Sequence, residues 1–171
     1  MLRNTRIKMP KYYSTKTYGN DRGLSCCFRQ WRSTHSHCSL LHGYSIGIRL
    51  VFESDTLDPR NWVMDFGGLK KFKQWAEYMF DHTTLVAEDD PHLDVFLNMA
   101  KINGGYKDLG MVDLRVVPAV GCEKFAEMAY IKMSQIIEEM KQTEGIIVNG
   151  NVRVKSVEVF EHEANSAIYE G

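Results

Sequence analysis

The sequence predicts an α+β fold in which helices cover one face of a mainly antiparallel sheet. Two segments place apolar residues at helical spacing, several others alternate apolar with polar residues, and strand-like segments stand both before and after the helical ones. The 171 residues fit one domain, and 44% hydrophobic with 25% charged residues is typical of a globular protein with a real core.

The first strand is predicted over residues 43–53, GYSIGIRLVFE, because apolar residues recur there at every second position. One face of this half-buried strand carries Tyr44, Ile46, Ile48, Leu50 and Phe52. Asp58-Pro59 then indicates a turn, and residues 62–66, WVMDF, predict a short second strand.

An amphipathic helix follows over residues 68–80, with Asp65 as its expected N-cap. Asp90-Pro91 predicts a second cap, with the proline in the first turn of a short helix that ends near Gly104.

The second half of the chain predicts a strand, a long helix and two more strands, at residues 111–117, 122–140, 152–160 and 167–171. In the third of these segments Val152 and Val154 differ in parity from Val157 and Val159. The alternation therefore predicts a β-bulge near Lys155.

Residues 1–22 are expected to form a basic N-terminal extension, and residues 23–171 a single domain. The first 22 residues carry six basic residues and one acidic residue, so the remainder sums to −6 in a chain of net charge −1. The extension is interpreted either as a solvated, partly disordered tail or as an arm that guides an anionic ligand or contacts nucleic acid. The acidic body, which has no aromatic-basic stripe, argues against a nucleic-acid surface.

No apolar run is long enough to cross a bilayer, and the first residues lack the apolar region of a secretory signal. We therefore expect a cytoplasmic protein with no membrane partner.

None of the four cysteines forms a Cys-x-x-Cys pair, which argues against a zinc knuckle. Cys26, Cys27 and Cys122 are expected to pack in the core, whereas Cys38, among polar groups and histidines, suits a chemical role.

Four separated motifs stand in one order along the chain: HCSLLHGYS at 37–45, NWVMDFGGLKKF at 61–72, FDHTTL at 80–85 and VEVFEHEANSAIYEG at 157–171. With LSCCFRQW at 24–31 and GCEKFAE at 121–127, they resemble the 6-pyruvoyl-tetrahydropterin synthase and 6-carboxytetrahydropterin synthase family. The resemblance implies the T-fold, a four-stranded mainly antiparallel sheet with two long helices on one face, which closes into an oligomeric barrel.

The resemblance implies that Cys38 is the catalytic cysteine, that Asp81 and His82 are the catalytic pair, and that Glu161 and Glu123 bind substrate. An imidazolium beside a thiol favours the thiolate, which can accept a proton. A carboxylate can accept two hydrogen bonds from the amino and ring N–H groups of a pterin. Taken alone, Asp81-His82 also suits a helix C-terminus, and Glu123 the first turn of a helix.

The same resemblance implies zinc held by three histidines. His42 retains the second ligand position, whereas Phe28 stands at the first and Tyr44 at the third. Tyrosine is a poor zinc ligand near neutral pH, because its phenol titrates near ~10.

Two alternatives would restore a zinc shell. His35 or His37 could lie beside His42, and a shift of one residue would bring Cys27 to the first ligand position. His42 and His37 are therefore the metal ligands expected from the sequence.

The resemblance implies a 6-carboxytetrahydropterin synthase-like lyase that acts on 7,8-dihydroneopterin triphosphate, in 7-deazaguanine (queuosine-type) or pterin biosynthesis. Family rings with sites between subunits imply a homo-oligomer, often a hexamer. The alternative is a metal-free T-fold protein that binds a pterin or purine without lyase activity, and different chemistry on a related substrate is a third reading. Residues 91–110 and the N-terminal arm depart from the compact family pattern.

Overall fold

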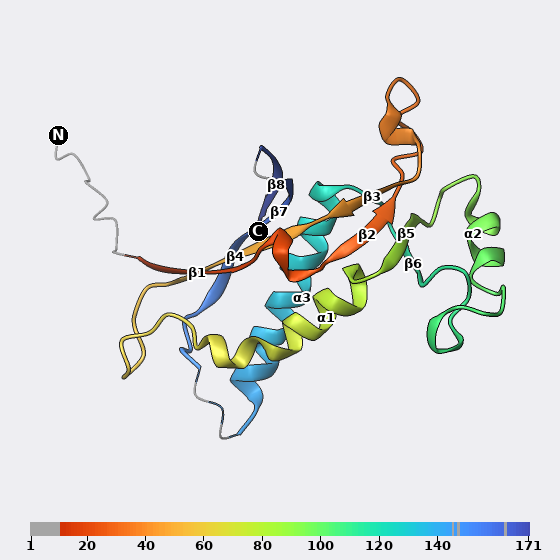
Figure 1. Ribbon diagram of the computed structural model, residues 1–171. Helices are drawn as coiled ribbons and strands as arrows, with labels where there is room; N and C mark the ends of the chain where they lie inside the picture. The colour runs from red at the N-terminus through yellow and green to blue at the C-terminus, as the bar shows by residue number, and fades with distance from the viewer. Residues whose placement is uncertain (1–10, 145, 147, 163) are drawn as a thin grey trace, which may run out of the picture.

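The computed structural model describes residues 11–144, 146, 148–162 and 164–171, which form two four-stranded sheets (Figure 1). The first sheet is antiparallel throughout and has the order β1-β4-β7-β8. Its strands are β1 (Tyr12–Tyr18), β4 (Gly47–Ser54), β7 (Arg153–His162) and β8 (Asn165–Glu170). This sheet confirms the predicted four-stranded antiparallel layer.

The second sheet was not expected from the sequence and has the order β3-β2-β5-β6. Its strands are β2 (Ser25–Phe28), β3 (His42–Ser45), β5 (Thr83–Ala87) and β6 (Leu114–Val117). β2 pairs antiparallel with β3 and parallel with β5, and β5 pairs parallel with β6. All five residues of β5 are buried, so this strand has no alternation for a sequence pattern to detect.

The strand predicted over 43–53 is divided between the two sheets at Ile46. β3 ends at Ser45, and β4 begins at Gly47. The ring of Phe160 in β7 lies so close to Gly47 that a Cβ there would be 2.1 Å from a ring carbon, so a side chain would displace the ring. Beyond this crossing the predicted alternation holds, because Ile48, Leu50 and Phe52 are fully buried.

The predicted bulge in β7 is confirmed at Lys155. Val51 pairs with Ser156, and the next residue, Phe52, pairs with Val154, so Lys155 has no partner in the register. The extra residue lets Val154 and Val157 both face the core despite their different parity.

The predicted long helices are α1 (Lys70–Phe80) and α3 (Cys122–Gln142), and the short one is α2 (Leu93–Met99). Asp65 accepts a hydrogen bond from the Gly67 N–H at 2.9 Å, but it caps the short 3-10 helix Phe66–Leu69 that leads into α1.

Two local predictions are wrong. Residues 62–66 form no strand: residues 62–65 are irregular, with Val63 and Met64 both buried, and Phe66 begins a 3-10 helix. Pro91 precedes α2 rather than lying in its first turn, since Asp90 caps the His92 N–H at 2.8 Å and the helix begins at Leu93 and ends at Met99.

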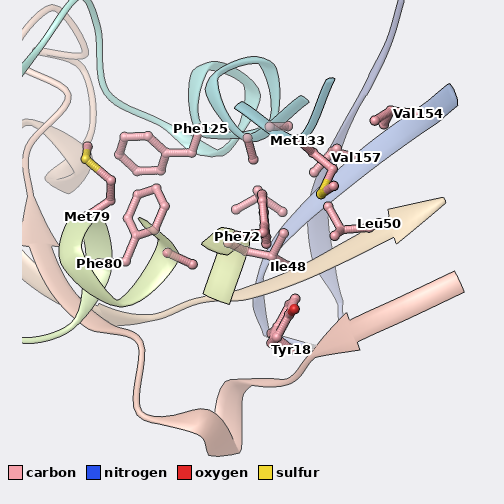
Figure 2. Packing of buried hydrophobic residues seen from close by; sticks show 14 of the residues in the cluster. Tyr18, Ile48, Leu50, Phe72, Met79, Phe80, Phe125, Met133, Val154 and Val157 are labelled. Carbon is pink, nitrogen blue, oxygen red and sulfur yellow. The ribbon is translucent and has the colours of Figure 1, made fainter. Parts of the chain in front are cut away.

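The hydrophobic core lies between the first sheet and the two long helices. Figure 2 shows helix side chains Phe72 and Met133 in the same cluster as strand residues Ile48, Leu50, Val154 and Val157, with Phe80 against Phe125 at one end. Buried apolar area at this interface is the main term that stabilises the layered fold.

Part of the expected N-terminal extension belongs to this core. Residues 12–18 form β1, which pairs with β4 along its whole length, and Tyr18 is buried in the core. Lys11 forms an ion pair with Glu53 at 3.1 Å. Residues 1–10 of the expected tail or arm lie outside the described residues.

No helix in the described part of the chain has the length and apolarity needed to cross a membrane.

Candidate active site

Cys38 lies in the loop between β2 and β3, which projects from the end of the second sheet (Figure 1). The residue sits in a 3-10 turn, His37–Ser39, whose cap Ser36 accepts the Cys38 N–H at 3.2 Å. The Cys38 carbonyl accepts the N–H of Gln30 at 2.8 Å. These bonds fix the backbone of a half-buried cysteine beside the end of β2.

A buried ion pair ties this loop to the end of β5. The Nε and Nη2 atoms of Arg29 donate to the two carboxylate oxygens of Asp90, each at 2.8 Å. The Asp90 side chain is only 1% exposed. Its hydrogen bonds from Arg29 hold the pKa of the Asp90 carboxyl below its usual value, despite the opposing effect of burial.

A row of aromatic rings crosses β2 and β3 next to Cys38. Phe28 and Tyr44 stack with ring centroids 4.0 Å apart and planes 9° apart. Phe28 meets Phe125 of α3 edge to face at 5.1 Å, and His42 packs on Tyr44 at 4.5 Å. Because Phe28 is almost fully buried, the row is anchored in the core at one end and reaches the surface at the other.

Glu161, near the end of β7, lies beside the first turn of α3. The Cys122 thiol donates to Glu161 Oε1 at 3.8 Å. Burial raises the pKa of Cys122 to about 12, and Glu161 and Glu123 add to the rise, so this thiol stays protonated. The Asn20 side-chain amide donates to the Glu161 carbonyl at 3.2 Å and to the carbonyl of Ser45 in β3.

Tyr44 connects these groups. Burial raises the pKa of Tyr44 to about 12, and the neighbouring acids Glu161 and Cys38 disfavour its phenolate further. Cys38 and Glu161, more than 120 residues apart in sequence, are therefore both close enough to Tyr44 to act on its pKa. Cys122 is a further neighbour of Glu161, although the sequence indicated only a packing role for it.

Glu123 is exposed in the first turn of α3, close to Gln30. A Cβ on Gly121 would lie 2.7 Å from Gln30 Nε2 and 3.6 Å from Glu123 Oε2. Gly121 also has a φ of 121°, which favours glycine. This glycine lets the Gln30 amide approach the backbone that precedes α3, so Gln30 is a neighbour of the site that the sequence did not indicate.

Asp81 and His82 lie at the other end of β2. The His82 N–H donates to the carbonyl of Ser25, whereas the Cys38 loop leaves β2 after Phe28, about 10 Å further along the strand. His82 Nδ1 lies 2.5 Å from Asp81 Oδ1, and the His82 side chain is 86% exposed. Within one chain, the structure does not bring His82 to Cys38.

The Asp81-His82 pair opens instead on a groove of about 920 Å³. Its other wall is residues 102–111, in the segment that departs from the compact family pattern. His82 has a left-handed φ of 56°, which is uncommon for a residue with a side chain. The pair therefore faces solvent in this groove, whose lining residues do not include Cys38.

The residues present do not fit the expected zinc shell. Among the described residues, no three histidine, cysteine or acidic side chains are grouped so that they could hold a metal ion. The stacked rings of Phe28 and Tyr44 occupy two of the three expected ligand positions. His42 Nδ1–H donates to the Leu40 carbonyl at 2.8 Å, which leaves Nε2 open, and the rings of His37 and His42 have centroids 6.4 Å apart.

The alternatives considered from the sequence do not complete the shell either. Cys27 alternates away from the buried face of β2 that carries Phe28, and its Sγ contacts Thr84 Oγ1 at 3.2 Å. His35 is exposed in the projecting loop. We therefore derive no chemical step through a metal.

The layered α+β fold, with a thiol and a carboxylate gathered at one end, defines a T-fold protein of the pterin synthase class. The model of the family described as 6-pyruvoyl tetrahydropterin synthase matches residues 20–171, so the chain belongs to that family. This confirms the resemblance seen in the motifs.

Relatives agree with this assignment. The chain is 27% identical over 135 residues to 6-carboxy-5,6,7,8-tetrahydropterin synthase from Aquifex aeolicus, covering 77% of this chain and 75% of the relative. An uncharacterized protein from Wolinella succinogenes matches with a TM-score of 0.74 and 21% identity, over 95% of this chain and 99% of its own. The 6-pyruvoyltetrahydropterin synthase of Plasmodium vivax matches with a TM-score of 0.61 and 14% identity, over 95% and 98%. The two solved structures support the fold.

Proposed function

We propose that the protein is a lyase that acts on 7,8-dihydroneopterin triphosphate in the manner of 6-carboxytetrahydropterin synthase, within 7-deazaguanine or pterin biosynthesis. The observation that carries the proposal is the position of Cys38 and Glu161 around Tyr44. Family membership and the name of the Aquifex aeolicus relative support a lyase-type activity.

Glu161 is the anchor for the substrate ring. In the described residues its carboxylate has no basic partner, and Cys122 is its sole hydrogen-bond donor. Such a carboxylate can accept paired hydrogen bonds from the amino and ring N–H groups of a pterin, because two parallel bonds match two oxygens. Glu123 borders the same region and is the second substrate-binding residue of the proposal.

Cys38 is the base. Its thiolate takes a proton from the substrate side chain, the carbon–oxygen bond to the triphosphate breaks, and triphosphate leaves with the bonding electron pair. A cysteine needs a neighbouring cation to form thiolate readily near neutral pH. His82 is that cation in the proposal, and Asp81 orients it through the 2.5 Å contact.

A neighbouring subunit supplies the Asp81-His82 pair. In one chain this pair is exposed and lies at the far end of β2 from Cys38, so a second protomer is needed to bring the groups together. We therefore propose a homo-oligomer, with the hexamer as the assembly that the family resemblance favours.

A second candidate function is carried by the Phe28–Tyr44 stack. Because these rings fill positions where the family expectation places zinc ligands, the chain also suits a metal-free protein that binds a pterin or purine without lyase activity. This candidate predicts less than stoichiometric zinc and ligand binding that depends on Glu161.

Triphosphate release from 7,8-dihydroneopterin triphosphate tests the enzyme. We expect release by the purified protein and a loss of about 10²- to 10⁴-fold in Cys38→Ala, since that is the usual contribution of a positioned base. Cys27→Ala, which removes a thiol from the opposite face of β2, is the matched control and should stay active. A wild type that binds the substrate but is as inert as Cys38→Ala would leave the binding protein as the function.

A further inference from the structure

The Tyr44 hydroxyl has no role in the proposed catalytic step, although the ring contacts Phe28 and His42 and is close to Cys38 and Glu161. Among the described residues, none forms a hydrogen bond with this hydroxyl. The side chain is half-buried, so part of it faces the space in which a ligand would lie. A polar group that is placed centrally and has no protein partner is available to a ligand.

The Tyr44 ring is held on both sides. Phe28 stacks on it at 4.0 Å, and His42 packs on it at 4.5 Å. Phe28 is itself fixed against Phe125 in the core. The direction of the phenol C–O bond is therefore set by packing before any ligand binds, which lowers the entropic cost of forming a hydrogen bond.

The phenol is a hydrogen-bond donor. A tyrosine hydroxyl carries its proton at neutral pH, and its O–H can be donated to an acceptor. The hydroxyl can therefore offer its O–H to a substrate oxygen.

We propose that Tyr44 contacts the substrate directly and donates a hydrogen bond to an oxygen of the side chain of the pterin that Glu161 anchors. This inference rests on the proposed function. Tyr44 is close both to the anchor Glu161 and to Cys38, the base that acts on the side chain, so we expect it to meet the substituent rather than the ring edge held by Glu161. Tyr44 thus distinguishes pterins with a hydroxylated side chain from the bare ring.

Two ligands and two variants test the inference. Binding of 7,8-dihydroneopterin and of 7,8-dihydropterin, which lacks the side chain, is measured by calorimetry. Tyr44→Phe keeps the ring stack and removes only the hydroxyl. We expect it to weaken 7,8-dihydroneopterin about 3- to 10-fold, the usual effect of one neutral hydrogen bond, and to leave 7,8-dihydropterin unchanged.

Glu161→Gln should weaken both ligands, and Tyr78→Phe, which removes a hydroxyl from the exposed face of α1, should affect neither. Equal affinities of Tyr44→Phe and wild type for 7,8-dihydroneopterin, or equal losses for both ligands, would overturn the inference while the Glu161 result upholds pterin binding. If the wild type binds neither ligand, the proposed function fails, and the inference fails with it.

Discussion

The two ends of β2 differ in how completely one chain builds them. At the Phe28 end, the aromatic row is anchored in the core and the Cys38 backbone is hydrogen-bonded on both sides. At the Ser25 end, His82 is 86% exposed on a left-handed backbone beside an open groove. The first end has the features of a preformed binding site, whereas the second exposes the Asp81-His82 pair, the proposed catalytic pair, away from Cys38.

The largest effect is expected from mixing two inactive variants, which tests whether the two ends of β2 from different subunits form one site. Cys38→Ala and His82→Ala should each lose about 10²- to 10⁴-fold in triphosphate release. If the pair acts on a neighbour's cysteine, unfolding and refolding the two variants together should restore activity, because some sites then combine an intact Cys38 with an intact His82.

Each variant refolded alone is the control and should stay inactive. A mixture no more active than its components, in a protein whose separate variants are inactive, would contradict a site shared between subunits.

Substitutions at the two ends of β2 should also differ in how much they lower the free energy of unfolding. Phe28→Ala removes an almost fully buried ring that contacts Tyr44 and Phe125, so it should lower the free energy of unfolding by about 3–5 kcal/mol. His82→Ala removes an exposed ring and should change it by less than about 0.5 kcal/mol. Urea denaturation at one fixed protein concentration measures both, and similar losses in the two variants would show that the ends are equally packed.

The smallest expected effect concerns the ion pair that ties the Cys38 loop to β5. Arg29 lowers the pKa of Asp90 in the folded state below the unfolded value of ~3.9. The pair therefore contributes fully above pH ~4, and its contribution is lost as the pH falls through the lower, folded pKa. Asp90→Asn should cost about 2 kcal/mol at pH 7.

The difference between wild type and Asp90→Asn should stay constant from pH 7 to pH 5 and narrow below pH ~4. Urea midpoints at pH 7, 5, 4 and 3 measure it. A difference that does not change with pH would show that the Asp90 charge contributes nothing.

Regular patterns in the sequence were sufficient for the long helices and for β4, β7 and β8 of the first sheet, but not for β1, which lies in the expected N-terminal extension. The apolar spacing located α1 and α3, and the parity change among the valines located the bulge at Lys155. The motifs also indicated Cys38 and Glu161 as site residues, and both act on the pKa of Tyr44 in the structure.

The missed features depend on contacts distant in sequence. The strand break at Ile46 lies next to Gly47, which the Phe160 ring of β7 approaches closely, and β5 is buried on both faces. Val63 and Met64 resemble a strand by composition, yet both are buried in an irregular segment. The separation of His82 from Cys38 follows from the pairing of β2 with β5, and no motif contains that information.

The Asn20 amide has a mechanical consequence. It joins the carbonyl of Ser45, where β3 crosses into β4, to the carbonyl of Glu161 in β7. A ligand that draws Glu161 towards itself therefore pulls, through one side chain, on the strand that carries Tyr44 and His42. If Glu161 anchors the substrate as proposed, Asn20 links the anchor to the strand that positions the aromatic row.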